Sequence, residues 1–223
     1  MRNICFAIAF VLFIIPSINI GSAFSFEQKF VFQKISSFLD ENKFLHLFGE
    51  IKNVSGKALT NIIVGASFYD VNHKLLNKFE RSAEVRTLNP KGISPFEILY
   101  YDTKSVNYIR NYTLSSTAQE TEIKPQALHI EQYKPRIDIL GFYYINGIVS
   151  NKGPGTATNS MVIAAMYDKN GNVISIGRAM AEPVNITSHS QAAFGIAVTE
   201  KLQTYKIRNF SLIADSDQYV LLP

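Results

Sequence analysis

Residues 64–70 read Val-Gly-Ala-Ser-Phe-Tyr-Asp, and residues 162–168 read Val-Ile-Ala-Ala-Met-Tyr-Asp. In both stretches every second residue is apolar, and alternate residues of a β-strand point to the same face of a sheet. We therefore predict that each stretch is a strand with one face in a core and with Tyr69 or Tyr167 on the opposite face. The predicted core residues are Val64, Ala66 and Phe68 in the first stretch and Val162, Ala164 and Met166 in the second.

The two stretches belong to an internal repeat in which each second-copy residue carries a number 98 higher than its partner. Residues 49–53 align with 147–151, and residues 109–114 align with 207–212, without a gap. A period of this length corresponds to a whole domain rather than to one unit of a solenoid.

Short alternating runs separated by turns, without a long helical period, are typical of an antiparallel β-sandwich. The segment 168–172, Asp-Lys-Asn-Gly-Asn, predicts a hairpin because Asn and Gly tolerate a positive φ, and residues 70–74 take its place in the first copy. We therefore expect an all-β protein with two tandem immunoglobulin-like sandwiches, loosely coupled and each stable alone. The expected divisions are a signal peptide at 1–23, a first sandwich at 24–118, a linker at 119–124 and a second sandwich at 125–223.

A family resemblance rests on the pattern Gly-x-Φ-x-Asn at 49–53, followed by Phe68-Tyr69-Asp70 and a hairpin. The chain resembles the FxLYD-type repeat, an immunoglobulin-like sandwich of exported archaeal and bacterial proteins, over residues 43–115 and 141–213. Met166 departs from the aromatic residue of that pattern. The resemblance implies a fold and an extracytoplasmic location, and it implies no reaction or catalytic residues.

The first residues have the features of a secretory signal peptide. Arg2 precedes an apolar run at 4–15 that Pro16 ends, and Gly21-Ser22-Ala23 offers small residues for cleavage. The run is shorter than the roughly 20 apolar residues of a spanning helix. We expect a secreted or cell-surface protein, and contact with a membrane only if this segment remains uncleaved as an anchor.

The charge and cysteine content exclude several classes. The 22 Lys and Arg residues are scattered against 18 Asp and Glu residues, and the formal net charge is +4, so nothing indicates a nucleic-acid partner. Cys5 is the single cysteine, and one cysteine cannot form an intramolecular disulfide.

No pattern in the sequence indicates an enzyme, a metal or a cofactor. His46, His73, His129 and His189 have no metal-like spacing, and no Gly-x-Ser-x-Gly motif is present. Asp168 begins an Asp-x-Asn-x-Asn run that resembles the start of a calcium loop, but the later Gly and acidic positions are not filled. We interpret Asp70 and Asp168 as turn formers whose carboxylates accept backbone amides.

Four Asn-x-Ser/Thr sequons are candidate glycosylation sites: Asn53, Asn111, Asn185 and Asn209. Asn53 aligns with Asn151, which is not in a sequon, so both are interpreted as structural turn residues. Asn111 and Asn209 align with each other as sequons, and a shared structural role is an equal alternative for them.

The aromatic residues supply the remaining candidate site. Tyr101 and Tyr143 are candidate contact residues if their strands expose one face. The leading hypothesis is a non-catalytic protein that contacts a surface layer, another exported or envelope protein, or itself. A carbohydrate-binding module is the alternative, and an enzyme or metal carrier would need a cleft in which carboxylates or histidines converge.

The small residues at 21–23 predict that the mature chain begins at Phe24. Mass spectrometry of the N-terminal peptide of the exported protein should find this residue first. An exported protein that still carries Arg2 would contradict the prediction.

Overall fold

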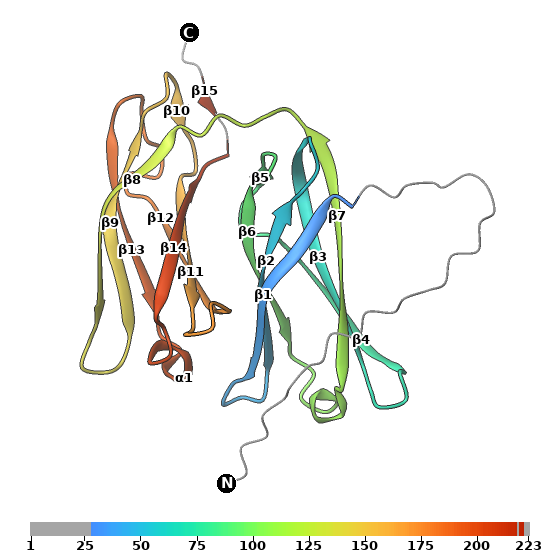
Figure 1. The fold of residues 1–223 in the computed structure, drawn as a ribbon. Helices are drawn as coiled ribbons and strands as arrows, with labels where there is room; N and C mark the ends of the chain where they lie inside the picture. The colour runs from blue at the N-terminus through green and yellow to red at the C-terminus, as the bar shows by residue number, and fades with distance from the viewer. Residues whose placement is uncertain (1–27, 218, 221–223) are drawn as a thin grey trace, which may run out of the picture.

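The structure is a computed structural model, and it describes residues 28–217 and 219–220. The predicted signal peptide and its cleavage site lie outside these residues. The chain is all-β, as predicted, and its strands build two antiparallel β-sandwiches connected by a segment that crosses one end (Figure 1).

The first sandwich pairs a sheet of order β1-β2-β6 with a sheet in which β3 lies between β4 and β7 and also pairs with β5. Its elements are β1 (Phe30–Leu39), β2 (Leu45–Asn53), β3 (Ala58–Tyr69), β4 (Leu75–Ser82), β5 (Thr87–Leu88), β6 (Ile93–Tyr100), the 3-10 helix η1 (Val106–Tyr108) and β7 (Asn111–Thr121).

The second sandwich repeats this plan with sheets of order β13-β9-β8 and β12-β11-β14, and β10 pairs with β15. Its elements are β8 (Leu128–Ile137), β9 (Tyr143–Asn151), β10 (Thr156–Ala157), β11 (Met161–Tyr167), β12 (Val173–Met180), β13 (Gln191–Val198), the helix α1 (Lys201–Thr204), β14 (Asn209–Asp215) and β15 (Tyr219–Val220).

The predicted core alternation is confirmed in both copies. The six predicted core residues of β3 and β11 are fully buried, and Phe68 and Met166 are among the largest of them. Tyr69 and Tyr167 lie on the opposite strand face, as predicted, because each directly follows a core residue, Phe68 or Met166.

The shared Gly-x-Φ-x-Asn pattern has a packing reason. A Cβ at Gly49 would lie 2.7 Å from the ring of Phe96, and a Cβ at Gly147 would lie 2.6 Å from the ring of Phe194. Each glycine therefore lets an aromatic ring from the neighbouring strand rest directly on the backbone of β2 or β9.

The predicted hairpin at 168–172 is confirmed, but it is a five-residue loop and not a two-residue Asn-Gly turn, since β11 ends at Tyr167 and β12 begins at Val173. Gly171 takes a positive φ of 80°, and His73 takes the same conformation in the first copy with a φ of 59°. The loop therefore keeps its backbone conformation in the first copy, where His73 stands in the place of Gly171.

The predicted linker at 119–124 is misplaced. Strand β7 continues to Thr121, where Ala58↔Thr121 and Leu59↔Glu120 still pair with β3, and the segment without a strand is 122–127. The polar residues within 117–121 belong to a strand with one exposed face. Such a strand end and a loop can have equally polar sequences, so polarity alone does not distinguish them.

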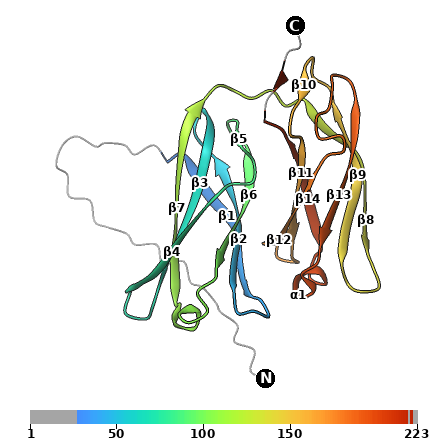
Figure 2. The same ribbon diagram turned by 180° about the vertical axis from the view of Figure 1, so that it is seen from behind.

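The expectation of loosely coupled domains is wrong. The outer face of the β12-β11-β14 sheet packs on the outer face of the β1-β2-β6 sheet, so the four sheets form successive layers (Figures 1 and 2). One apolar cluster joins Phe48 and Ile51 of β2 to Ile163, Tyr167 and Ile176 of the second sandwich. The two sandwiches therefore share part of their core.

Replacing Phe68 with Ala should lower the free energy of unfolding by roughly 3–5 kcal/mol, because the fully buried ring packs edge-on against Tyr100. Val71→Ala, at a position that is 71% exposed, should change it by less than about 0.5 kcal/mol. Chemical denaturation checks both values, and equal losses would contradict the assignment.

Candidate functional site

The interface between the sandwiches gathers most of the buried charges. Alternation along β2 directs His46, Phe48 and Glu50 away from the first sandwich core and toward β11 and β12. Sequence analysis did not find this site, because the residues that meet are separated by more than a hundred positions.

Glu50 is the most deeply buried acidic residue of this interface, with 2% of its surface exposed. The Tyr167 hydroxyl donates to Glu50 Oε1 at 2.6 Å, and Gln33 Nε2 donates to Oε2 at 2.7 Å. Lys34 Nζ lies 3.3 Å from the carboxylate and 4.6 Å from the centre of the Tyr167 ring. The buried carboxylate is therefore both paired and hydrogen-bonded, as burial of a charge requires.

Tyr167 is tuned by this arrangement. Burial and the hydrogen bond to Glu50 raise the pKa of its hydroxyl to about 12, although the contact with Ser211 Oγ at 2.8 Å acts in the opposite direction. The hydroxyl thus stays protonated and remains a donor at any physiological pH.

A second cluster lies nearer the β1–β2 turn. His46 Nδ1 lies 2.8 Å from Glu97 Oε1, and Nε2 lies 3.5 Å from Asp40 Oδ2, while the Phe38 ring stacks on the imidazole with ring centres 4.7 Å apart. Arg178 of β12 reaches across to this cluster and pairs with Glu97 at 3.5 Å.

The pKa values of the cluster shift toward the charged forms. Burial acts to lower the pKa of His46, but the hydrogen bonds and charges of Glu97 and Asp40 outweigh it, and the pKa is raised. Burial acts to raise the pKa of Glu97, but the hydrogen bond and charge of His46, together with Arg178, lower it. The pair is therefore an ion pair over a wider pH range than isolated groups would form.

A third set of contacts fixes the linker. Lys124 Nζ lies 2.6 Å from Asp215 Oδ1, and Asp215 Oδ2 accepts the backbone amide of Arg86 at 3.0 Å. The side chain of Asn89 bonds both the amide and the carbonyl of Lys124. The second sandwich is thus held at the linker end as well as at the interface.

A cavity of about 240 Å³ opens between the sandwiches beside His46. Its acidic residues are already engaged: Asp40 and Glu97 with His46, and Glu200 with the amide of Leu202. Within residues 28–217, no group of three or more His, Cys, Asp or Glu residues is arranged to hold a metal ion.

The four predicted turn residues have the predicted role. Asn53 Nδ2 donates to the carbonyls of Lys57 and Leu88, and Asn151 Nδ2 donates to the equivalent carbonyls of Gly155 and Ile186. Both asparagines are fully buried. A glycan on Asn53 would need this buried amide nitrogen, so Asn53 is wrong as a glycosylation site of the folded domain.

The two predicted turn aspartates behave alike. Asp70 Oδ1 accepts the amides of Asn72 and Lys74, and Asp168 Oδ1 accepts those of Asn170 and Asn172 at 2.8 and 2.9 Å. Each carboxylate therefore closes its own turn, as predicted.

The remaining candidates are dispersed over the surface. Asn185 and Asn209 are exposed, and Asn111 is half-buried with its amide 3.5 Å from His73 Nδ1. Tyr101 is 61% exposed and packs edge-on against Phe79, whereas Tyr143 is half-buried and packs against the second core. The structure thus does not bring Tyr101 and Tyr143 into one platform.

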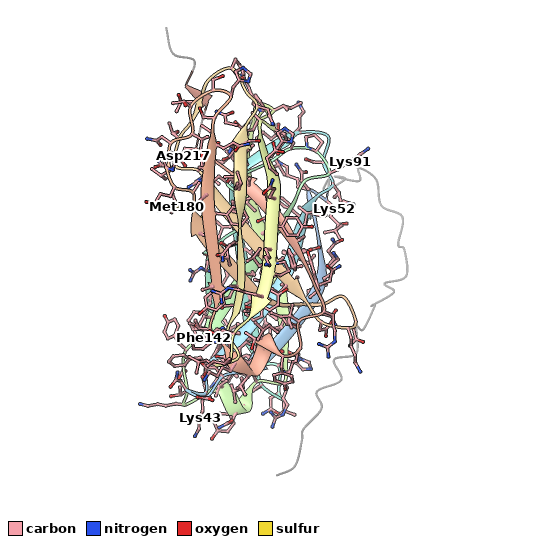
Figure 3. All side chains as sticks on the ribbon, turned by 90° about the vertical axis from the view of Figure 1, so that its left-hand side faces the viewer. Lys43, Lys52, Lys91, Phe142, Met180 and Asp217 are labelled. Carbon is pink, nitrogen blue, oxygen red and sulfur yellow. The ribbon has the colours of Figure 1, made fainter. Side chains whose placement is uncertain are left out.

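Seven of the fifteen exposed large apolar residues in the described part of the chain lie instead at the end of the molecule opposite the linker, which we call the loop end (Figures 1 and 2). Phe142 and Lys43 mark this end in Figure 3, with Met180 and Asp217 toward the other. The loop end comprises residues 40–44, 70–74, 101–110, 138–142, 168–172 and 199–208. Its exposed members include Val71, Tyr101, Tyr108, Ile139, Leu140 and Tyr205.

Among residues 28–217, no helix is long and apolar enough to span a membrane. No protein-family model matches the chain, and no curated protein is detectably similar to it in sequence.

In fold the chain is similar to portions of larger proteins of solved structure. Red sea bream transglutaminase matches with 10% identity and a TM-score of 0.29, over 85% of this chain and 29% of the enzyme. The exo-chitosanase CsxA of Amycolatopsis orientalis matches with 8% identity and a TM-score of 0.31, over 86% of this chain and 26% of the enzyme. The chain spans less than a third of either protein, and neither activity is transferred to it.

Replacing Tyr167 with Phe should lower the free energy of unfolding by about 1–3 kcal/mol, because the buried Glu50 carboxylate loses its closest donor. The repeat supplies a matched control: Tyr69→Phe removes only a 3.5 Å contact to Thr113 and should cost less than about 0.5 kcal/mol. Urea denaturation of both variants checks the difference, and equal effects would contradict it.

The His46–Glu97 pair should make stability depend on pH. The raised pKa of His46 stabilises the fold fully below the ordinary value of about 6.5, and this contribution is lost as pH rises through the folded value. The lowered pKa of Glu97 stabilises the fold above about 4.3, and this contribution is lost as pH falls through the folded value. Between these limits both contributions are present.

The melting temperature measured by calorimetry should therefore be highest between about pH 5 and 6.5 and should fall at higher pH. In His46→Gln, which keeps a hydrogen-bonding side chain without a titration, the decline above pH 6.5 should be weaker. A parallel decline in both proteins would exclude His46 as its source.

Proposed function

We propose that the chain is a non-catalytic, extracytoplasmic protein that contacts another exported or envelope protein through its loop end. The observation that carries the proposal is the gathering of exposed apolar and aromatic side chains there, including Tyr108 at 64% and Val71 at 71% exposure. Exposed apolar groups that cluster on a folded surface mark interaction sites, whereas single ones are common.

The rigid joint between the sandwiches supports a role in contact. The shared apolar cluster, the Glu50–Tyr167 bond and the Lys124–Asp215 pair hold the loops of both sandwiches in one arrangement. A preorganised surface loses less entropy on binding than a mobile one.

The extracytoplasmic location rests on the sequence of the first 23 residues. We also propose membership of the FxLYD-type repeat family, on the basis of Phe68-Tyr69-Asp70 and the aligned Met166-Tyr167-Asp168. The sandwich fold is compatible with that proposal.

Carbohydrate binding is a second candidate, favoured by the exposure of Tyr101. Tyr143, the other predicted sugar contact, packs against Phe210 in the second core. Glycan-array binding that is lost in Tyr101→Ala would support this candidate over protein contact.

Capture of envelope proteins from the producing cell tests whether the loop end, rather than another surface, makes the contact. Replacing Tyr101 and Tyr108 together with Ser should reduce capture about tenfold or more, the usual cost of losing an aromatic contact residue. The matched control replaces Val54 and Ile123, exposed at the linker end, and should retain capture. Equal capture by all three proteins, with unchanged melting temperatures, would contradict the proposal.

A further inference from the structure

The tip of the second sandwich is the most apolar part of the loop end. The β8–β9 turn places Ile139 at full exposure, with a relative value of 102%, and leaves Leu140 and Ile137 each 57% exposed. The turn that carries them connects β8 and β9 and lies at the extremity of that hairpin (Figure 1).

The turn that presents them is closed by its own hydrogen bonds. Asp138 Oδ1 accepts the amides of Leu140 and Phe142 at 2.9 and 3.0 Å, and these bonds help to hold the pKa of the Asp138 carboxyl below its usual range. The carboxylate is thus part of the turn.

The internal repeat shows that this turn does not require apolar residues. In the first sandwich Asp40 makes the same bond to Phe44, and the residues equivalent to Ile139 and Leu140 are Glu41 and Asn42. The apolar tip is therefore a property of the second copy alone and has no evident folding role.

Helix α1 widens the tip. Thr204 Oγ1 donates to the carbonyl of Gly141 at 2.7 Å, which places Leu202 and Tyr205 beside the turn with 38% and 64% of their surfaces exposed. Lys201 Nζ lies 5.2 Å from the centre of the Phe142 ring. Apolar, aromatic and cationic groups thus alternate around the hairpin.

The charges around the tip favour an anionic partner. Arg136 lies with its guanidinium 4.3 Å from the centre of the Tyr144 ring, and Lys201, Lys206 and Arg208 surround α1. Of the two acidic residues of this region, Asp138 is bound within its turn and Glu200 accepts the amide of Leu202 at the start of α1.

We propose that the tip of the second sandwich docks on an anionic lipid bilayer, with Ile139 and Leu140 inserted at the headgroup–acyl boundary and the basic residues against lipid phosphates. A projecting apolar tip bordered by Tyr, Phe and Lys has the chemistry of membrane-interface segments, in which aromatic residues lie at headgroup level and cations bind anionic lipids. A protein partner would have to supply a deep pocket for Ile139, whereas a bilayer accommodates a projecting side chain directly. The inference goes beyond the proposed protein contact, because it assigns the second-sandwich part of the loop end a partner of its own.

Co-sedimentation of the full mature chain with vesicles tests the proposal. Equimolar phosphatidylcholine and phosphatidylglycerol vesicles should bind the protein, and pure phosphatidylcholine vesicles should bind it at least about tenfold more weakly. The double variant I139E/L140N, which gives the turn the residues of the first copy, should lose binding to the anionic vesicles by about tenfold or more. The same changes at the linker end, V54E with I123N, should leave binding intact.

A spectroscopic measurement makes the test independent of the yield of any single variant. The chain contains no Trp, so Ile139→Trp introduces one reporter at the tip, and its emission should shift to shorter wavelength with anionic vesicles. The proposal is overturned if the parent chain does not bind these vesicles, if I139E/L140N binds them equally, or if the Trp emission does not move.

The two proposals fail separately. Loss of vesicle binding with capture of envelope proteins retained would overturn the bilayer contact alone. Vesicle binding that depends on Ile139, together with capture that ignores Tyr101 and Tyr108, would support the bilayer contact and overturn the protein contact. If I139E/L140N abolishes self-association while the parent chain has no affinity for vesicles, the tip contacts a second copy and the bilayer proposal is wrong.

Discussion

The hydrogen bond between the Tyr167 hydroxyl and the buried Glu50 carboxylate joins the two sandwiches at the centre of their contact. A carboxylate can stay charged in such a place only if donors surround it, and Gln33, Lys34 and Tyr167 provide them. Around this point the apolar residues of β11 and β12 close over β2. This contact therefore sets how the loops of one sandwich lie relative to the loops of the other.

The two copies have diverged on the outer faces of their β11–β12 and β3–β4 strands, and these faces determine whether another sheet can pack there. The β11 and β12 face presents Ile163, Ala165 and Ile176 to the first sandwich, but the equivalent positions of β3 and β4 are Gly65, Ser67 and Lys78. The first face is covered and the second is solvated. This difference accounts for a stack of two sandwiches in which the outer β3–β4–β7 sheet faces water (Figure 2).

The loop ends have diverged in the same sense, because the second copy again carries the apolar residues. The first-copy turn 40–44 keeps Glu41 and Asn42 at the tip, while the second-copy turn 138–142 exposes Ile139 and Leu140 on the same aspartate-bound backbone. The two turns share a backbone conformation but expose different side chains, as expected when a fold is retained and its contacts change. The rigid joint then presents both turns on the same side of the molecule.

Local patterns were sufficient to predict the strand alternation, the repeat, the buried faces of β3 and β11 and the turn roles of Asn53, Asn151, Asp70 and Asp168. These features depend on contacts within one copy and on periods of two residues. It did not determine the end of β7, since a polar run suits both an exposed strand face and a linker. The contacts of Glu50 with Tyr167 and of Glu97 with Arg178 became apparent only in the folded chain. They join outer faces of separate sheets, and no local pattern specifies which outer face covers which. His46 and Glu97 lie on adjacent strands of one sheet, β2 and β6, and their pairing depends on how those strands align. The one signal within the chain was the change from Ile148 to Glu50 and from Gly195 to Glu97 between aligned positions, whose meaning depends on how the sandwiches pack.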